Sequence, residues 1–512
     1  MCGIAGYLDA AQAGPPHAAR VRAMMDDLAH RGPDASGFFA EGPVMLGHRR
    51  LSIIDLRPEA DQPLANEDGS VVVVANGEIY NFRALRDELE RRGHRFRSRS
   101  DSEVIVHLYE EHGVACLSHL RGMFAFALWD ARRRRLLLAR DRAGEKPLYY
   151  AAQGGSLWFA SELRALAGAL PWQPALDLGA IDDYLTLQYV PAPSTIWSGV
   201  RKLSAAHCLT MTPGSAPVVE RWWRLRFAPG RATSLPDAVA ETRALVEDAV
   251  AVREVADVPL GAFLSGGIDS STVVALLARR AGRAVKTFSV DMPSGGEASW
   301  ARLVARHFGT EHHELTMQPR MVDLLPELTA RYGEPFADPS ALPTFYLSQL
   351  ARRHVTVALS GDAGDEAFAG YHRYALEELA QRVGRLPWPL PRLVHAILRR
   401  LPGRSLRKVR EFAAHRWRSP VERYLFLLAH FSRRDKERLR GAAFADRPAD
   451  DGVAAELARV LAASDAGDAV NRLLDLDTQT YLPDDIFTKV DIASMAHALE
   501  VRAPFALSLI HI

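Results

Sequence analysis

The chain has 512 residues, of which 63 are basic and 62 acidic, so its formal net charge is +1. Its 48% hydrophobic and 24% charged residues are typical of a globular protein, and its length predicts about two to four domains. The near-neutral balance excludes the strongly basic surface of a protein that binds nucleic acid or anionic membranes. We therefore expect neither partner.

The cysteines and the hydropathy pattern indicate the compartment. Cys2, Cys116 and Cys208 are too few for a disulfide framework and have no zinc-site spacing, which favours a reducing environment. We find no signal peptide, and no apolar run reaches the about 20 residues that a membrane span needs. We expect a cytoplasmic protein.

The chain up to about residue 170 is rich in strand signals. Helical periodicity appears only at 18–32 and 81–93, and each of these segments ends on a glycine suited to a helix C-cap. This order predicts sheets with helices packed on them. The β-branched and aromatic runs that predict the strands are 42–55, 70–82, 122–141 and 147–161.

A change of composition at residues 190–230, toward Pro, Gly and isolated aromatics, predicts a domain boundary. We place the two domains at 2–218 and 219–512. From about residue 234, helices alternate with short apolar strands, which predicts an α/β domain with a parallel sheet. Residues 376–480 have an almost purely helical, arginine-rich pattern.

The first six residues, Met-Cys-Gly-Ile-Ala-Gly, place a thiol directly behind the start methionine. Removal of Met1 would leave Cys2 with a free α-amino group, whose ordinary pKa is about 7.7–8.0. Thiol and base would then share one residue, as in N-terminal nucleophiles. Chain ends are usually frayed, so on these six residues alone a coincidental cysteine stays open.

Residues 259–270, Pro-Leu-Gly-Ala-Phe-Leu-Ser-Gly-Gly-Ile-Asp-Ser, predict a strand, a tight loop and a helix start. Loop amides, the hydroxyls of Ser265 and Ser270, and the helix N-terminus together suit a bound phosphate. The loop is not a Walker A motif, because no Gly-Lys-Ser/Thr closes it. Asp269 could hold Mg²⁺ against the phosphates, while a purely structural turn is the alternative.

A second loop, Ser-Gly-Asp-Ala-Gly-Asp-Glu at 360–366, also follows an apolar strand. Asp362, Asp365 and Glu366 repel one another unless a cation neutralises them. We expect Asp365 to be the second Mg²⁺ ligand. A solvated acidic loop is the alternative.

Together with Gly-Tyr-His-Arg-Tyr at 370–374, these loops resemble the pyrophosphatase-loop synthetase domain of glutamine-dependent asparagine synthetases. The resemblance extends from residue 2 to about 506 and includes 333–352 and 481–505. It implies a four-layer αββα N-terminal-nucleophile fold (α+β), followed by an α/β parallel-sheet synthetase domain with a helical C-terminal part. The segments that resemble the family's class II glutamine amidotransferase domain are 2–6, 30–34, 48–55, 75–81, 100–106 and 140–150.

The resemblance implies a glutamine site in the first domain. Cys2 would be the nucleophile that forms a γ-glutamyl thioester, and Asn76 with the Gly77 amide would form the oxyanion hole. Arg50 and Asp101 would hold the carboxylate and the amino group of glutamine. The other implied contacts to glutamine are Leu51, Ser52, Ile53, Ile54 and Glu78.

The resemblance also implies an ATP site that uses Mg²⁺, held by Asp269 and Asp365. Asp362 stands where the family carries an acidic residue proposed as a base. The family activates aspartate as an acyl-adenylate with release of pyrophosphate, and ammonia then displaces AMP. The implied ATP contacts are Leu264, Ser265, Gly266, Gly267, Asp269, Ser270, Val290, Ser360 and Gly361.

The expected reaction uses glutamine, aspartate and ATP, but two alternatives stay open. Relatives amidate other carboxylates, such as sugar acids of surface polysaccharides, or close lactam rings, although lactam-forming relatives generally lack the terminal cysteine. A non-catalytic homologue is disfavoured because Cys2, Asn76, Asp269 and Asp365 are intact. The departures from the family pattern at Ala363 and Trp300 remove no proposed ligand, and a homodimer stays open.

The resemblance ends after Phe505 or Ala506, where relatives usually continue with a helical stretch. That stretch contains a lysine thought to stabilise the adenylation transition state, a role we do not transfer to Lys489. We expect the natural gene to continue, the synthetase domain to be incomplete, and this chain to hydrolyse glutamine but perform the ATP step poorly. A shortened family member ending in a short strand is the alternative.

Overall fold

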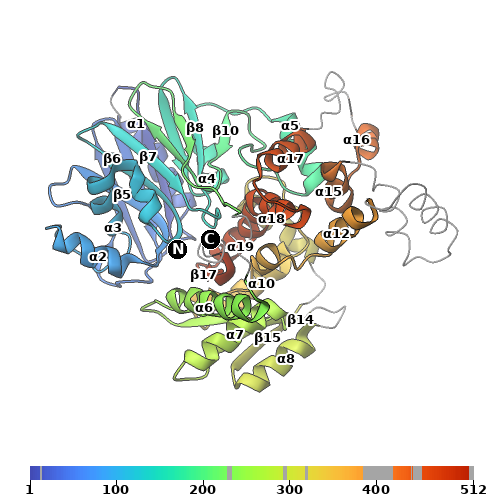
Figure 1. The fold of residues 1–512 in the computed structure, drawn as a ribbon. Helices are drawn as coiled ribbons and strands as arrows, with labels where there is room; N and C mark the ends of the chain where they lie inside the picture. Colours follow the sequence, from blue (N-terminus) through green and yellow to red (C-terminus); the bar gives the residue numbers. More distant parts are fainter. Residues whose placement is uncertain are drawn as a thin grey trace.

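Three β-sheets organise the chain in the computed structural model (Figure 1). Two six-stranded antiparallel sheets belong to the first part of the chain, and a five-stranded parallel sheet belongs to the second. The described residues are 1–11, 14–227, 233–291, 297–317, 321–384, 419–439, 441 and 452–506. The expectation about residues 507–512 lies outside them.

The first antiparallel sheet has the order β10-β8-β9-β1-β3-β2, with the strand that follows Cys2 near its centre. The predicted strand run at 42–55 forms β3 at its start and continues as a loop. The strands are β1 (Gly3–Leu8), β2 (Ala35–Glu41), β3 (Val44–Arg50), β8 (Tyr149–Gln153), β9 (Ser156–Ala160) and β10 (Val200–Lys202).

The second antiparallel sheet has the order β12-β11-β7-β6-β5-β4. Its long strands come from the predicted runs at 70–82 and 122–141. The predicted boundary between 218 and 219 lies in its edge strand and stays a prediction. The strands are β4 (Leu64–Ala65), β5 (Val71–Ile79), β6 (Gly122–Asp130), β7 (Arg135–Arg140), β11 (His207–Met211) and β12 (Val218–Arg221).

Apolar side chains on both faces of each sheet make four layers. Between the sheets, Ile4 and Leu46 from the first share a core with Val74 and Leu138 from the second. Helices α1 (Pro15–Asp27) and α4 (Leu163–Ala169) cover the outer face of the first sheet, and α2 (Phe82–Arg91) and α3 (Val104–His112) cover that of the second. The predicted αββα arrangement is confirmed.

One helix end departs from the prediction. The helix predicted over 18–32 ends at Asp27, so Gly32 is not its C-cap. A Cβ on Gly32 would lie 2.3 Å from the Arg49 carbonyl, so the glycine permits close passage beside β3.

The parallel sheet has the order β15-β14-β13-β16-β17. The chain adds β14 and β15 on one side of β13 and then crosses to add β16 and β17 on the other side, so the order reverses between β13 and β16. In such sheets ligands bind outside the carboxyl ends of the strands where this reversal occurs. Both predicted loops lie there, after β13 and after β16. The strands are β13 (Leu260–Phe263), β14 (Lys286–Asp291), β15 (Glu311–Thr316), β16 (Val357–Leu359) and β17 (Glu500–Arg502).

Helices flank this sheet and then form a separate helical layer, as predicted (Figure 1). None of the described helices combines the length and the apolar character that crossing a membrane requires. The helices beside the sheet are α6 (Leu235–Arg253), α7 (Ile268–Arg280), α8 (Glu297–Phe308), α9 (Leu325–Tyr332), α10 (Ala341–Arg352), α11 (Gly364–Phe368) and α19 (Thr488–Met495). The helical layer contains α5 (Leu178–Leu187), α12 (His372–Gly384), α15 (Pro420–Leu428), α16 (Arg433–Leu439), α17 (Gly452–Ala463) and α18 (Ala469–Gln479).

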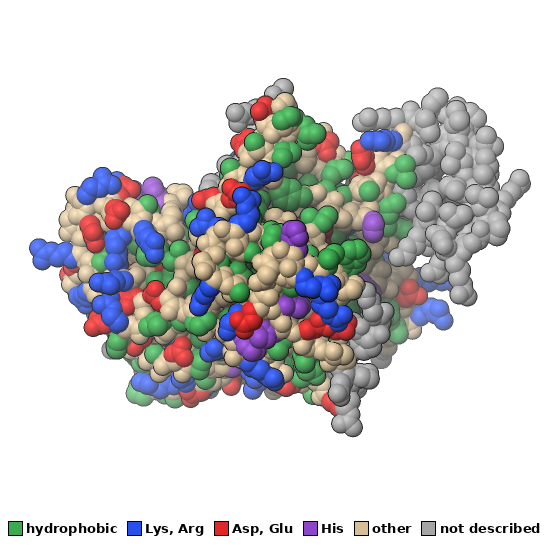
Figure 2. Space-filling view, turned by 90° about the horizontal axis from the view of Figure 1, so that it is seen from below, with side chains coloured by type: hydrophobic (Ala, Val, Ile, Leu, Met, Phe, Trp, Pro, Cys, Tyr) green, Lys and Arg blue, Asp and Glu red, His purple; other side chains and the backbone are tan. Residues whose placement is uncertain are grey.

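The two halves meet through one buried junction. Met1, Leu51 and Ile53 share a hydrophobic core with Leu264 and Phe505 from the second half. Strand β17 reaches this junction and lies beside the N-terminus (Figure 1). On the face shown in Figure 2, acidic and basic side chains are interspersed, in keeping with the near-neutral net charge.

Candidate active sites

Cys2 lies at the start of β1, with 7% of its surface exposed. Its backbone nitrogen donates to Asn76 Oδ1 at 2.8 Å, and its carbonyl accepts from Arg31 Nε at 3.1 Å. Burial raises the pKa of the Cys2 thiol, whereas the positive N-terminus and the Leu51 amide act in the opposite direction. The thiol is thus held in place by its own backbone contacts.

Asn76 and Gly77 on β5 have the features of an oxyanion hole. Asn76 Nδ2 is buried without a hydrogen-bond partner among the described residues, although buried amides are normally paired. Gly77 has φ +145°, and a Cβ there would lie 2.0 Å from the Met123 carbonyl oxygen. Only glycine fits this position, so the backbone keeps its course beside the thiol.

Glu78 on β5 and Asp101, which is hydrogen-bonded to β5, are two buried carboxylates that repel each other. Asp101 accepts from the Ile79 amide at 2.7 Å, and Arg502 from β17 approaches Glu78 at 3.5 Å. Glu78 Oε2 has no hydrogen-bond partner among the described residues. Burial raises the pKa of both carboxyls, and for Glu78 the neighbouring Asp101 adds to the shift. A cationic amino group would relieve this arrangement.

Arg50 is committed to its own loop more than the sequence implied. Its Nη1 donates to Asp61 at 2.6 Å and to the Arg57 carbonyl at 3.1 Å, and its Nη2 donates to the carbonyls of Ile54 and Asp55. A glutamine carboxylate would therefore compete with Asp61. Of the other residues assigned to the loop, Leu51 and Ile53 are buried and Ser52 and Ile54 are half-buried.

The α-amino group here belongs to Met1, which pairs with Glu500 Oε2 at 2.6 Å in a fully buried contact. Glu500 also accepts from Arg502 Nε at 2.6 Å. Burial alone would raise the pKa of Glu500, but the Met1 amino group and Arg502 lower it to about 2. The base predicted on Cys2 requires the removal of Met1.

The loop after β13 leads directly into helix α7, as predicted, while its binding of phosphate stays a prediction. Ser265 Oγ lies 3.0 Å from Ser270 Oγ, and the Gly267 amide donates to Ser265 Oγ at 3.3 Å. Gly266 has φ +85°, and a Cβ there would meet the Ala301 nitrogen of α8 at 2.5 Å. Leu264 is buried below the loop and Val290 on β14 is half-buried.

The acidic loop after β16 packs directly against the start of α7. Cβ atoms built on Gly361 and Gly364 would lie 2.7 Å from the Ser270 nitrogen and 2.5 Å from Asp269 Cγ. Ser360 Oγ is buried without a partner among the described residues. Ala363 adopts φ +70°, a left-handed conformation that favours glycine.

Three carboxylates from the two loops, those of Asp269, Asp362 and Asp365, lie close together, and all carry negative charge. Burial, Asp365 and Asp362 raise the pKa of Asp269 to about 6. Burial also raises the pKa of Asp365, with Arg373 opposing it. An all-oxygen set of half-buried carboxylates fits Mg²⁺, which would remove the repulsion.

Comparison with known proteins identifies the family. Residues 1–223 match the glutamine amidotransferase domain family, and residues 241–507 match the asparagine synthase family. The chain is 34% identical to glutamine-hydrolysing asparagine synthetase 1 of Bacillus subtilis (strain 168), covering 95% of this chain and 76% of that protein. The chain belongs to the glutamine-hydrolysing asparagine synthetase family.

Two further relatives indicate the breadth of this asparagine synthetase family. A protein of Mycobacterium tuberculosis (strain ATCC 25618 / H37Rv), provisionally named a glutamine-hydrolysing asparagine synthetase, is 37% identical and covers 99% of this chain and 80% of its own length. Amidase chyE of Penicillium rubens (strain ATCC 28089 / DSM 1075 / NRRL 1951 / Wisconsin 54-1255) is 32% identical, covering 74% of this chain and 61% of its own length.

The second half of the present chain contains a buried polar cluster to which the sequence analysis assigned no role. Lys489 Nζ lies 3.0 Å from Asp338 Oδ2. Burial acts to lower the pKa of Lys489, but the nearby carboxylates of Asp338, Asp362 and Asp485 outweigh it and raise this pKa above its ordinary value. Burial and Asp338 raise the pKa of Asp485 to about 7. A buried ammonium therefore lies among carboxylates beside Asp362.

A second part of the cluster adds aromatic rings and a guanidinium. Tyr371 donates to Glu366 at 2.7 Å, and the Arg373 guanidinium lies 3.9 Å from the Tyr371 ring centre and 4.7 Å from that of Tyr481. Tyr371, Arg373 and Tyr481 lie in the segments 370–374 and 481–505, whose family resemblance was the available signal. Their convergence across about a hundred residues was not readable from spacing.

Proposed function

We propose that this protein is a glutamine-dependent amidotransferase that converts aspartate to asparagine, with ATP cleaved to AMP and pyrophosphate. The observation that carries the proposal is that one chain joins a buried Cys2–Asn76 pair to two Ser-Gly loops at the reversal point of a parallel sheet. The first suits acyl transfer from an amide, and the second suits a nucleotide's phosphates.

In the glutamine site, Cys2 Sγ attacks the amide carbon of glutamine once Met1 has been removed. The freed amino group, held by Asn76 Oδ1, takes the thiol proton and later passes a proton to the leaving ammonia. Asn76 Nδ2 and the Gly77 amide donate to the oxyanion that develops. Water then cleaves the thioester and releases glutamate, while Glu78 and Asp101 hold the substrate's amino group.

In the ATP site, the Ser265–Gly267 loop and Ser360–Gly361 hold the phosphates. Asp269 and Asp365 would hold Mg²⁺, which neutralises phosphate charge when bound. The acceptor carboxylate attacks the α-phosphorus and pyrophosphate leaves; ammonia then attacks the acyl carbon and AMP leaves. Asp362, beside Lys489, is positioned to accept a proton from the attacking ammonia.

Ammonia must reach the second site before it becomes ammonium in bulk water. Support for an internal route is the apolar core at the junction, where Leu51 and Ile53 pack with Leu482 and Ile486. An apolar passage favours the neutral nucleophile, because a cation would lose its hydration there.

Another carboxylate acceptor is the second candidate, because a relative that covers 74% of this chain is named an amidase rather than an asparagine synthetase. Mass spectrometry of products formed from glutamine, ATP, Mg²⁺ and a panel of carboxylic acids tests the choice. We expect asparagine from aspartate. Amidation of a sugar acid or another carboxylate, with aspartate unchanged, would replace the proposed acceptor.

A further inference from the structure

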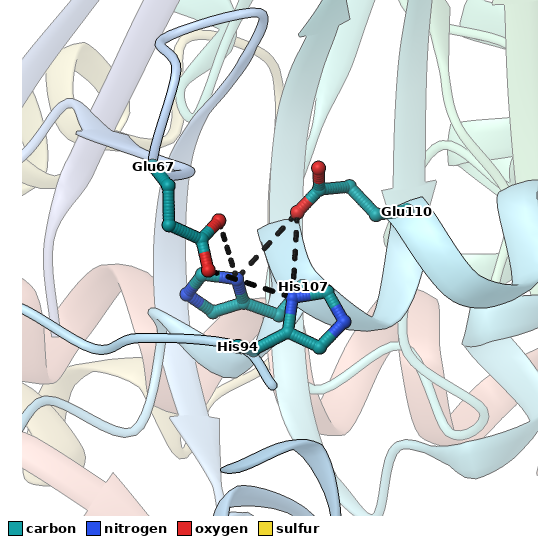
Figure 3. Close-up of side chains that lie close together, drawn as sticks. All are labelled: Glu67, His94, His107 and Glu110. Carbon is teal, nitrogen blue, oxygen red and sulfur yellow. Dashed lines mark ion pairs between the residues drawn. The ribbon is translucent and has the colours of Figure 1, made fainter. Parts of the chain in front are cut away.

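Two histidines and two glutamates converge on the second antiparallel sheet, within the first domain. Glu67 lies in the turn between β4 and β5, His94 in the loop after α2, and His107 and Glu110 on α3. Figure 3 shows both carboxylates pointing toward the two imidazole rings. One nitrogen or oxygen from each residue lies within 4.8 Å of all the others.

The distances have the scale of one ion's coordination shell. His107 Nδ1 lies 3.5 Å from Glu67 Oε2 and 3.6 Å from Glu110 Oε2, and His94 Nδ1 lies 3.7 Å from Glu110 Oε2. Ligands about 2.1 Å from a tetrahedral ion are about 3.4 Å apart. The donors therefore need to move only slightly to share an ion.

His107 carries the independent sign of a missing ligand. Its side chain is fully buried, and neither ring nitrogen has a hydrogen-bond partner among the described residues. Glu110 Oε2 is likewise buried without a hydrogen bond, while Asn66 donates to the other oxygen of Glu110 at 2.8 Å. Buried polar atoms are rarely left without a hydrogen bond, so His107 Nδ1 and Glu110 Oε2 are available to bind a ligand.

Outer carboxylates are arranged as they are around metal-bound histidines. The Nε2 of His94 lies 3.0 Å from Glu111 Oε1, and the Nε2 of His107 faces Glu103 at 3.9 Å. For His94, the hydrogen-bonded carboxylate behind the ring fixes the tautomer and leaves Nδ1 free to bind a metal. Glu103, 3.9 Å from His107 Nε2, is too distant for a hydrogen bond in this structure. In both rings, Nδ1 is the nitrogen directed at Glu67 and Glu110.

We propose that Glu67, His94, His107 and Glu110 form a structural site for one Zn²⁺ ion, separate from the proposed ATP site. Imidazole with carboxylate is a donor set that suits zinc rather than magnesium, and four protein ligands close a tetrahedral structural site. The ion would fasten the β4–β5 turn, the loop after α2 and helix α3 to one another. No spacing in the sequence predicts this site, because three separate segments contribute its ligands.

The test measures zinc in the full chain after treatment with EDTA, reloading with Zn²⁺ and desalting in excess Mg²⁺. We expect about one tightly held Zn²⁺ per chain more than in Glu110→Gln or His94→Ala, and binding at least about 100-fold weaker in these variants. Glu110→Gln keeps an oxygen for Asn66 but is a poor ligand. His112→Ala, on the same helix and stacked on His119, is the matched control and should bind like wild type.

Thermal unfolding and Co²⁺ absorption test the same site independently of zinc content. Zn²⁺ at 100 times its Kd should raise the midpoint of thermal unfolding of wild type by about 2 °C or more, and this shift should be absent in His94→Ala. Co²⁺ should give visible absorption typical of tetrahedral coordination. Equal zinc content in wild type and both ligand variants, or no retained zinc in wild type, would show an ion-pair cluster only and overturn the proposal.

Discussion

The proposed glutamine site is closed, and its buried carboxylates have partners within the chain, whereas the proposed ATP site is open and its carboxylates are not neutralised. Cys2 is 7% exposed and Asn76 is fully buried, while Ile268, at the start of the helix below the phosphate loop, is 86% exposed. Folding alone organises the first site. The second is organised toward charges that only a nucleotide and a cation can bring.

The electrostatics follow the same division. In the glutamine site, buried charges are matched across the two halves, since Arg502 lies between Glu78 and Glu500 and Glu500 holds the N-terminus. In the proposed ATP site, Asp269 lies near two further carboxylates, and within the described residues no ion pair compensates its charge. In the first site the charged groups bind one another and so fix the geometry, whereas in the second site they are available to bind ligands.

Removal of the nucleophile should separate the two sites most sharply. We expect Cys2→Ala to lose glutamine hydrolysis by about 10⁴-fold or more, because the thiol forms the covalent intermediate. Exchange of pyrophosphate into ATP in the presence of aspartate should stay near the wild-type rate. Glutamate release at the wild-type rate would refute the role of Cys2.

The unpaired Asn76 amide should be the next largest contributor to the closed site. Asn76→Ala should lower kcat for glutamine hydrolysis by about 10²–10³-fold, as loss of one oxyanion-hole donor does elsewhere. Steady-state kinetics check this, with Asn471→Ala, in helix α18 of the helical layer, as a control asparagine outside the pocket. An effect on KM alone would assign Asn76 to binding rather than to the transition state.

The open site should depend on its two carboxylates. Asp269→Asn and Asp365→Asn should each lower ATP–pyrophosphate exchange by at least about 10²-fold, because the cation they would hold contributes several kcal/mol. Glutamine hydrolysis should be unchanged in both. Exchange at the wild-type rate in either variant would remove that residue from the Mg²⁺ site.

The junction should matter for stability more than a surface ion pair does. Arg502→Met leaves Glu78 and Glu500 without their buried partner, which should cost about 3–5 kcal/mol. The half-exposed Arg302, paired with Glu314, offers Arg302→Met as a control at about 0–1 kcal/mol. Urea unfolding followed by fluorescence compares them, and equal losses would contradict the junction's role.

Acid should weaken the open site before the closed one. A pKa of about 6 for Asp269 means that its carboxylate is protonated progressively below pH 6, and a proton competes with Mg²⁺ for it. At low Mg²⁺, exchange should fall about tenfold between pH 7 and pH 5. Higher Mg²⁺ should shift the midpoint to lower pH; a midpoint that ignores Mg²⁺ would detach Asp269 from the metal.

The local chemistry of the ATP loop was predictable because it is written in consecutive residues. Strand, Ser-Gly-Gly and helix follow one another at 259–280, and the structure has them in that order. The αββα layers came from the family resemblance, since strand runs alone do not set sheet order. The helix end at Asp27 was mispredicted because Gly32 serves packing against β3 rather than a cap.

Contacts between segments that lie far apart in the sequence could not be predicted. Met1 and Glu500 pair across 499 residues, and no pattern in either segment foretells it. The environment of Lys489 and the zinc ligands likewise depend on tertiary approach of separate segments. The roles assigned to the site residues, as distinct from their positions, stay predictions.

The most direct test of the account is to follow the amide nitrogen itself. Glutamine labelled with ¹⁵N at the amide is incubated with ATP, Mg²⁺, aspartate and unlabelled ammonium, and the products of wild type and Cys2→Ala are compared by mass spectrometry. The account predicts ¹⁵N-asparagine, with one AMP formed for each, from wild type, even where the ATP step of this chain is slow and glutamate is in excess, and only unlabelled asparagine from the variant. Glutamate and AMP formed without label in an amide product, or label transferred by Cys2→Ala, would contradict it.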